Sequence, residues 1–195
     1  MGLWAAGGFI AAVLLFGGCG GGAEQKSAGR ASQGQTPQAS GEAGQRKIAA
    51  PELPTAPDFE LPRLEGGTLR LSDFRGNIVI LDFWATWCAP CRMSIPHLIR
   101  LHQDMKDEHV VVIGVALDQG SPKLVERFAE EFRIPYPIVF GDPQVVAAYG
   151  NFQSIPVSFL INERGEVVER YVGFRPRQVY EDAIRSLREE SNSGS

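Results

Sequence analysis

The apolar residues of this chain gather in short runs that glycine, proline and charged residues separate. The run at 78–84, Ile-Val-Ile-Leu-Asp-Phe-Trp, is almost continuously apolar, which is typical of a strand in a buried parallel sheet. Segments 58–61 and 68–71 alternate apolar and polar residues around Gly66-Gly67 and predict a β-hairpin. Further strands are expected at 110–117, 137–140, 157–161 and 166–172, the last two forming a second hairpin.

Proline and capping residues indicate where the helices begin. Pro90 is compatible with the first turn of a helix, so we expect one over 89–106. Ser121 can accept free backbone N–H groups, and Pro122 suits a first helical position. Further helices are therefore expected over 121–132, from 142 onward and over 176–188. This order of elements predicts an α/β fold in which helices flank a central mixed β-sheet.

The N-terminal segment has a different composition from the rest of the chain. Residues 1–18 carry no charged side chain and run apolar from Leu3 to Phe16, which predicts a signal peptide. The ending Gly17-Gly18-Cys19 resembles a bacterial lipobox, in which Cys19 would be lipidated. An ordinary cleaved signal and an uncleaved membrane anchor are the alternatives.

Composition also divides the remainder of the chain. Residues 20–50 are mostly Gly, Ala, Ser and Gln, so we expect 19–50 to be a lipidated cysteine followed by a disordered tether. Residues 51–190 have the size and apolar content of one catalytic domain, and 191–195 are expected to be a disordered tail. The formal net charge of −4 argues against nucleic acid as a partner.

Cys88 and Cys91 are separated by two residues, at the junction between the predicted strand at 78–84 and the helix at 89–106. The free N–H groups at a helix N-terminus stabilise a thiolate, so we expect a lowered pKa for Cys88 and dithiol-disulfide chemistry. Haem attachment would need a histidine where Arg92 stands. A zinc site lacks a second pair of ligands, and a purely structural bridge over so short a loop would stabilise weakly.

With these residues in place, the chain resembles the thioredoxin superfamily and, within it, the TlpA/ResA-like thiol-disulfide oxidoreductases. The resemblance covers about residues 54–188 and rests on three segments. They are Ala-Pro-Asp-Phe-Glu-Leu-Pro from 56, Leu-Asp-Phe-Trp-Ala-Thr-Trp-Cys-Ala-Pro-Cys at 81–91, and Ser-Ile-Pro-Val-Ser-Phe-Leu-Ile at 154–161. It implies a thioredoxin-like fold with an N-terminal β-hairpin and a central insert at about 122–151.

The resemblance also implies roles for residues around the cysteines. Asp82 matches a buried carboxylate that exchanges a proton with Cys91, and the strand period places it on the same face as Trp84. A carboxylate in an apolar strand is costly unless it is used, which favours general acid-base catalysis over a structural role. Pro156 is expected to be cis and to face the dithiol.

Several neighbours of the dithiol are expected to contact an extended substrate segment. The backbone of Ile155 would pair with it, and Trp87, with Ala89 and Pro90, would line the site. Some ResA-like proteins have a glutamate three residues after the second cysteine, where this chain has Ser94. Their acid-dependent tuning is therefore not carried over.

The function expected from these features is reduction of disulfide bonds in exported proteins on the extracytoplasmic side of a bacterial envelope. The protein would be lipid-anchored to a membrane and need no soluble cofactor and no metal. Apocytochrome c is a candidate substrate, and a membrane protein of the CcdA/DsbD type is the expected electron donor. The alternatives are a lipid-anchored peroxiredoxin-like peroxidase, which would need a threonine where Ala85 stands, and a non-catalytic binding module.

Overall fold

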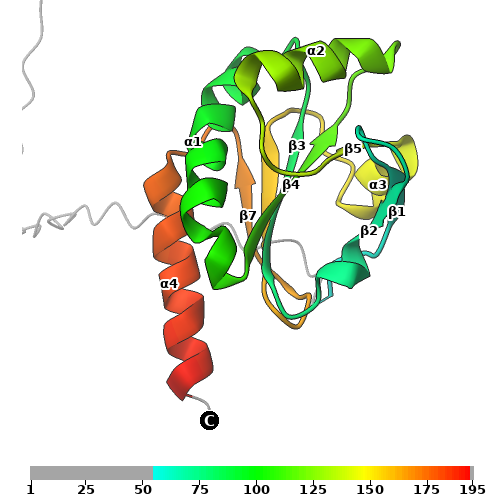
Figure 1. The fold of residues 1–195 in the computed structure, drawn as a ribbon. Coiled ribbons are helices and arrows are strands. Elements are labelled where there is room, and N and C mark those ends of the chain that lie inside the picture. Colours follow the sequence, from blue (N-terminus) through cyan, green and yellow to red (C-terminus); the bar gives the residue numbers. More distant parts are fainter. Residues whose placement is uncertain (1–54, 194–195) are drawn as a thin grey trace, which may run out of the picture. The chain divides into compact units, whose positions relative to one another are not determined.

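The computed structural model describes residues 55–193, and the sheet at its centre follows the predicted order of elements (Figure 1). Its five strands lie in the order β5-β4-β3-β6-β7. Strands β3 (Ile78–Trp84), β4 (Val110–Ala116) and β5 (Ile138–Phe140) are parallel. Strands β6 (Val157–Ile161) and β7 (Val167–Val172) run antiparallel to their neighbours. The predicted mixed sheet is confirmed.

The helices connect these strands as βαβ units. Helix α1 (Ala89–Met105) leads from β3 to β4, and α2 (Pro122–Phe132) leads from β4 to β5. The short helix α3 (Pro143–Ala148) precedes β6, and the Asp142 carboxylate caps it by accepting the Val145 N–H. Two short 3-10 helices, η1 (Leu71–Phe74) and η2 (Lys106–Glu108), follow β2 and α1. The central insert expected at about 122–151 corresponds to the α2–β5–α3 stretch, in which β5 is the edge strand of the main sheet.

The N-terminal hairpin pairs β1 (Glu60–Pro62) with β2 (Thr68–Arg70). It begins two positions later than predicted, because Asp58 does not extend the strand. Its carboxylate instead accepts the N–H groups of Phe59 and Ser72, as a turn residue does. Leu71 likewise leaves the predicted strand and starts η1.

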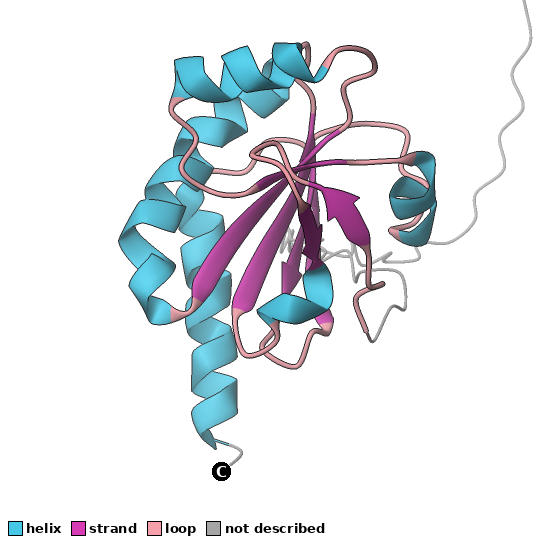
Figure 2. Ribbon diagram, turned by 45° about the vertical axis from the view of Figure 1, so that its right-hand side comes forward, coloured by secondary structure: helices cyan, strands magenta, loops and turns pink. Residues whose placement is uncertain are grey.

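The two faces of the sheet carry different elements. Figure 1 shows α1 and α4 (Arg177–Ser193) together on one side and the β1–β2 hairpin with α3 on the other. Side chains of β3 alternate between these faces: Val79, Leu81 and Phe83 join the core beneath the hairpin, whereas Ile78 and Ile80 pack with helix residues such as Leu98 and Ile184. Asp82 therefore lies on the helix-covered face. The turned view in Figure 2 shows the same layers.

Helix α4 extends further than we predicted. It was expected to end at 188, but it runs to Ser193 and so includes residues 191–193 of the predicted disordered tail. Arg188 anchors this end by donating to the carboxylate and the backbone carbonyl of Glu108. Helix ends fray, and these contacts hold the C-terminal part of α4 next to η2.

The predictions for the signal peptide, for Cys19 and for the tether lie outside the residues that the structure describes. Within residues 55–193, no helix combines the length and the apolar character needed to cross a membrane.

Candidate active site

The two cysteines lie where β3 meets α1, as predicted, and form a disulfide bond. Cys88 is the N-cap of α1 and has an extended backbone, whereas Cys91 lies in its first turn. The local sequence explains this boundary, because Pro90 fixes a helical φ angle and needs no N–H partner there. The Cys91 N–H donates to Cys88 Sγ over 3.2 Å, so the helix terminus offers a donor to the first sulfur.

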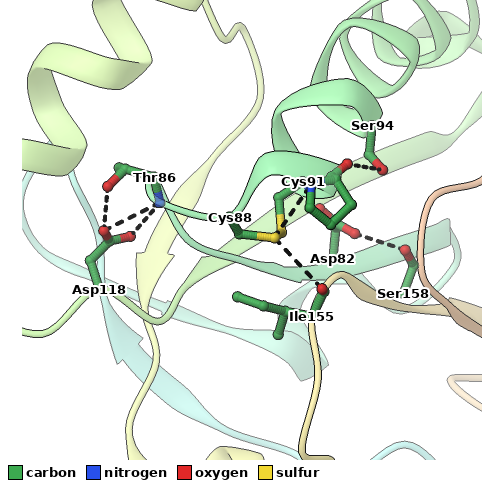
Figure 3. The surroundings of a disulfide bond; sticks show 9 residues. Asp82, Thr86, Cys88, Cys91, Ser94, Asp118, Ile155 and Ser158 are labelled. Carbon is green, nitrogen blue, oxygen red and sulfur yellow. Dashed lines mark hydrogen bonds between the residues drawn. A yellow bond between two sulfur atoms is a disulfide. The ribbon is translucent and has the colours of Figure 1, made fainter. Parts of the chain in front are cut away.

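The segment before β6 faces this sulfur. The Ile155–Pro156 peptide bond is cis, as predicted. The Ile155 carbonyl oxygen lies 3.6 Å from Cys88 Sγ, which is a contact rather than a hydrogen bond in the closed disulfide, since neither sulfur then carries a proton. Figure 3 shows this contact across the gap between two chain segments distant in sequence. Pro156 itself is buried, whereas Ile155 is half-buried.

Four residues that are close to the nearly buried disulfide in the sequence are exposed, and we call them the rim. Trp87 is 70% exposed and Met93 is 58% exposed, while Ala89 and Pro90 are also open to solvent. Cys88 is only 4% exposed. Aromatic side chains and Met are enriched where proteins contact one another, so an exposed Trp87 suits contact with another chain. The prediction that Trp87 would be exposed and Trp84 packed is confirmed, since Trp84 is fully buried against Phe128.

Asp82 lies on β3 beneath the first turn of α1 and is almost fully buried. Figure 3 shows its side chain rising from the strand between the disulfide and Ser158. Burial raises the pKa of Asp82 from 3.8 to about 6, because the ionised form loses its hydration, and the hydrogen bond from Ser158 opposes this shift. A carboxyl group with such a pKa can exchange protons near neutral pH.

The sequence analysis missed a contact that holds the loop before Cys88. The Asp118 carboxylate accepts the Thr86 N–H, at 3.0 and 3.2 Å from its two oxygens, and the Thr86 hydroxyl at 2.5 Å (Figure 3). Asp118 directly follows the strand predicted at 110–117, and residues at the carboxyl end of a parallel strand often belong to a functional site. The sequence did not show that this strand lies next to the one ending at Trp84, so the contact with Thr86 could not be predicted.

Ser94 stands where some ResA-like proteins have glutamate, and it is buried. Its hydroxyl donates to the Pro90 carbonyl over 3.3 Å, four residues earlier in the same helix (Figure 3). The Ser94 hydroxyl is therefore satisfied within the helix, and this position supplies no carboxylate to the site.

One cationic group stacks on aromatic rings beside the site. The Arg92 guanidinium lies 5.5 Å from the ring centroids of Phe128 and Phe132, which stack on each other in α2. This contact joins α1 to α2 next to the rim. Arg92 occupies the position where haem attachment would require histidine.

The structure thus brings most of the predicted site residues together. Cys88, Cys91 and Asp82 converge from β3 and α1, and Ile155 with Pro156 approaches from the segment before β6. The residues that we missed are Thr86, Asp118 and the Ser158 that bonds Asp82.

Comparison with known proteins gives a consistent result. Residues 54–170 match the AhpC/TSA family. The chain is 41% identical over 136 residues to the thiol-disulfide oxidoreductase ResA of Geobacillus kaustophilus, covering 69% of this chain and 76% of that protein. It is 32% identical over 154 residues to ResA of Bacillus subtilis, covering 78% and 83%.

A solved structure described as a thiol:disulfide interchange protein DsbE, from Chlorobium tepidum, is also similar. It shares 35% sequence identity with this chain and superposes with a TM-score of 0.64, covering 69% of this chain and 95% of that one. This likeness confirms the predicted thioredoxin-like fold.

Proposed function

We propose that this chain, which belongs to the AhpC/TSA family and is a ResA-like thiol-disulfide oxidoreductase, reduces disulfide bonds in exported proteins. The observation that carries the proposal is the Cys88–Cys91 pair, with Cys88 Sγ at 3.6 Å from the Ile155 carbonyl and Trp87 exposed beside it. A polypeptide that pairs with the Ile155 backbone would bring its own disulfide onto Cys88.

The reaction has two steps. In the first, the Cys88 thiolate attacks one sulfur of the substrate disulfide. A mixed disulfide forms, and the other substrate sulfur leaves with the electron pair and takes up a proton. In the second, Cys91 gives its proton to Asp82 and attacks Cys88 Sγ. The Cys88–Cys91 bond forms, and the remaining substrate sulfur leaves as a thiolate and is protonated. The substrate gains two electrons, and the enzyme is left oxidised.

The direction of electron flow is part of the proposal. Ala89 and Pro90 between the cysteines provide neither histidine nor charge, so the thiolate has less stabilisation than in strong oxidants. A donor must then reduce the Cys88–Cys91 bond again, and a membrane electron carrier of the CcdA/DsbD type fits this role. Apocytochrome c is a candidate substrate.

We place the protein on the extracytoplasmic side of a bacterial envelope. The support is the uncharged apolar stretch at 1–18 followed by Cys19, which suits export and lipid attachment. Labelling of growing cells with a fatty-acid analogue should modify the wild-type protein and fail to modify a Cys19→Ser variant.

Trapping in cells tests the reductase. A Cys91→Ser variant forms the mixed disulfide but cannot resolve it, so partners should co-purify through a bond that dithiothreitol breaks. Cys88→Ser is the matched control and should trap none. Recovery of exported proteins with Cys91→Ser supports the proposal, whereas equal recovery with both variants would contradict it.

The AhpC/TSA family match also brings peroxide reduction into consideration. The position three residues before Cys88 is the buried Ala85, which has no hydroxyl group for a peroxide. We therefore expect the reduced protein to reduce a disulfide peptide much faster than hydrogen peroxide. For a binding module, the double Cys88→Ser, Cys91→Ser variant would keep full function in cells.

A further inference from the structure

The buried carboxylate of Asp82 is the end of a hydrogen-bonded chain that reaches another layer of the fold. Ser158 lies directly opposite Asp82 in the register between β3 and β6, and its hydroxyl is 2.7 Å from Asp82 Oδ1. The same hydroxyl is 3.0 Å from the hydroxyl of Tyr180, which α4 presents from the helix-covered side. All three side chains are buried.

The direction of these hydrogen bonds follows from the number of available protons. An ionised carboxylate only accepts, so the single proton of Ser158 goes to Asp82. The Ser158 oxygen can then only accept from Tyr180, whose hydroxyl is the donor. The chain therefore runs from Tyr180 through Ser158 to Asp82, and each donor is polarised by the bond that follows it.

The two oxygens of Asp82 are not equivalent. Oδ1 accepts from Ser158, whereas Oδ2 is buried and has no hydrogen-bond partner among residues 55–193. In Figure 3 this second oxygen lies on the side of Cys91. A buried acceptor without a donor is costly, which is expected where a group must take up a proton during the reaction.

We propose that Ser158 and Tyr180 are positioning residues, which hold Oδ1 of Asp82 in a fixed hydrogen bond and leave Oδ2 as the oxygen that takes the proton of Cys91. This inference rests on the proposed reductase reaction and assigns a function to the contact between α4 and β6. The hydrogen bonds from Tyr180 to Ser158 and from Ser158 to Asp82 favour the ionised carboxylate, because both strengthen as negative charge develops on Asp82.

Few other titratable groups face this carboxylate. Figure 3 draws Cys91 of α1 next to Asp82. Tyr136, whose hydroxyl is buried without a partner in the described part of the chain, precedes β5, and the charge of Asp82 acts on it. Burial raises the pKa of Tyr136 and of Tyr180, so both stay neutral over the working pH range. His102 packs against Tyr136, and burial lowers its pKa, which keeps it uncharged near neutral pH.

Charged groups lie one layer further out. The positive charge of Arg175 lowers the pKa of Tyr180, opposing the larger effect of burial. The Tyr171 ring packs edge-on against the Tyr180 ring, with 5.1 Å between the ring centroids. A substitution at Ser158 or Tyr180 can therefore remove these hydrogen bonds while the charged groups around Asp82 stay the same.

The test is the pH dependence of mixed-disulfide resolution in the full-length protein. The mixed disulfide between Cys88 and a cysteine peptide is formed, and release of the peptide is followed by rapid quench from pH 5 to 9. In the wild type, the rate should rise with pH through the ionisation of Asp82. Ser158→Ala should move the midpoint upward by roughly one pH unit, because a hydrogen bond to a charged group is lost. Tyr180→Phe should move it in the same direction by less.

The matched control is Tyr136→Phe, which removes a buried hydroxyl near the same carboxylate without breaking the chain. The midpoint of the pH profile should not move in Tyr136→Phe. Ser158→Thr, which keeps the hydroxyl, should have the same midpoint as the wild type. In an Asp82→Asn background, Tyr180→Phe should have no further effect on the profile.

A midpoint unchanged by Ser158→Ala and Tyr180→Phe in folded protein would overturn the inference, as would an equal shift with Tyr136→Phe. Thermal unfolding monitors folding independently. Failure of the proposed function is distinguishable, because the wild type itself would then not reduce disulfide substrates at any pH.

Discussion

At the scale of single residues, the two cysteines differ in what surrounds their sulfur atoms. Cys88 is at the end of the helix, accepts the Cys91 N–H and lies beside the exposed Trp87. Cys91 lies in the first turn of α1 and is fully buried. From this asymmetry we propose that Cys88 attacks the substrate and that Cys91 carries out the resolving step.

Alkylation of the reduced protein tests this asymmetry. At neutral pH, iodoacetamide should modify Cys88 at least about tenfold faster than Cys91, the difference expected from one pKa unit of thiolate stabilisation alone. Mass spectrometry of peptides from quenched samples measures both rates. Cys88→Ser and Cys91→Ser provide single-thiol references, and equal labelling would contradict the assignment.

Asp82 links the chemistry of the site to the stability of the fold. Its pKa is raised from 3.8 to about 6, so the folded protein holds this proton more tightly than the unfolded chain does. The stability gained from the proton is present below about pH 4 and is lost as the pH rises through 6. Above that pH, the buried charge costs stability.

We therefore expect Asp82→Asn to stabilise the folded protein at pH 7.5, by roughly 2–3 kcal/mol, because an asparagine has no charge to bury. The gain should shrink as the pH falls toward 4.5. Denaturant unfolding at several pH values measures it, and Asp107→Asn, at an exposed carboxylate, is the control. A loss of stability at pH 7.5 would show that the charge is better compensated than the structure indicates.

At the scale of elements, the loop between β3 and α1 is fixed by the loop that follows β4. Asp118 satisfies both the backbone N–H and the hydroxyl of the buried Thr86, two residues before Cys88. The two strands are parallel neighbours, so their carboxyl ends bring these loops together. The position of Cys88 thus depends on a residue far away in the sequence.

Asp118→Ala should lower the free energy of unfolding by roughly 1–3 kcal/mol, because it leaves two buried donors of Thr86 without a partner. Denaturant unfolding with the disulfide closed provides the measurement. Asp118→Asn keeps one acceptor oxygen and should lose less. If Asp118→Ala is as stable as the wild type, water satisfies Thr86 instead, and the loop does not need this contact.

At the scale of the whole described region, the two faces of the sheet differ in the elements that cover them and in the polar side chains they carry. The face under α1 and α4 carries Asp82 and Ser158, Tyr180 of α4 reaches Ser158 from the covering helix, and the disulfide lies at the end of this face. The other face is apolar and is closed by the β1–β2 hairpin, whose Leu61 and Leu69 are cross-strand partners. We therefore expect that stability can be altered on one face without changing the reactivity of the cysteines on the other.

Leu69→Ala tests this separation. It removes a buried side chain from the hairpin and should cost about 2–4 kcal/mol of unfolding free energy. The alkylation rate of Cys88 in the folded, reduced protein should stay unchanged. Thr68→Ala, at an exposed position of the same strand, should have little effect on stability. A marked change in Cys88 reactivity would show that the two faces are coupled.

The sequence by itself determined the order of the elements and the local geometry of the dithiol. The apolar run ending at Trp84, the Cys88–Cys91 spacing and Pro90 act over neighbouring residues, so strand, N-cap and first turn could be predicted together. The first hairpin begins two residues later than predicted because the Asp58 side chain found a distant partner in Ser72, and α4 runs five residues beyond its predicted end at 188.

Only the tertiary structure decided which distant residues reach the site. Ser158 meets Asp82 because β6 pairs with β3 in one antiparallel register, and a shift by one residue would turn it to the other face. Tyr180 and Asp118 depend on how α4 docks and on which strand neighbours β3. Register and docking are set by packing across the whole core, which no short stretch of sequence contains.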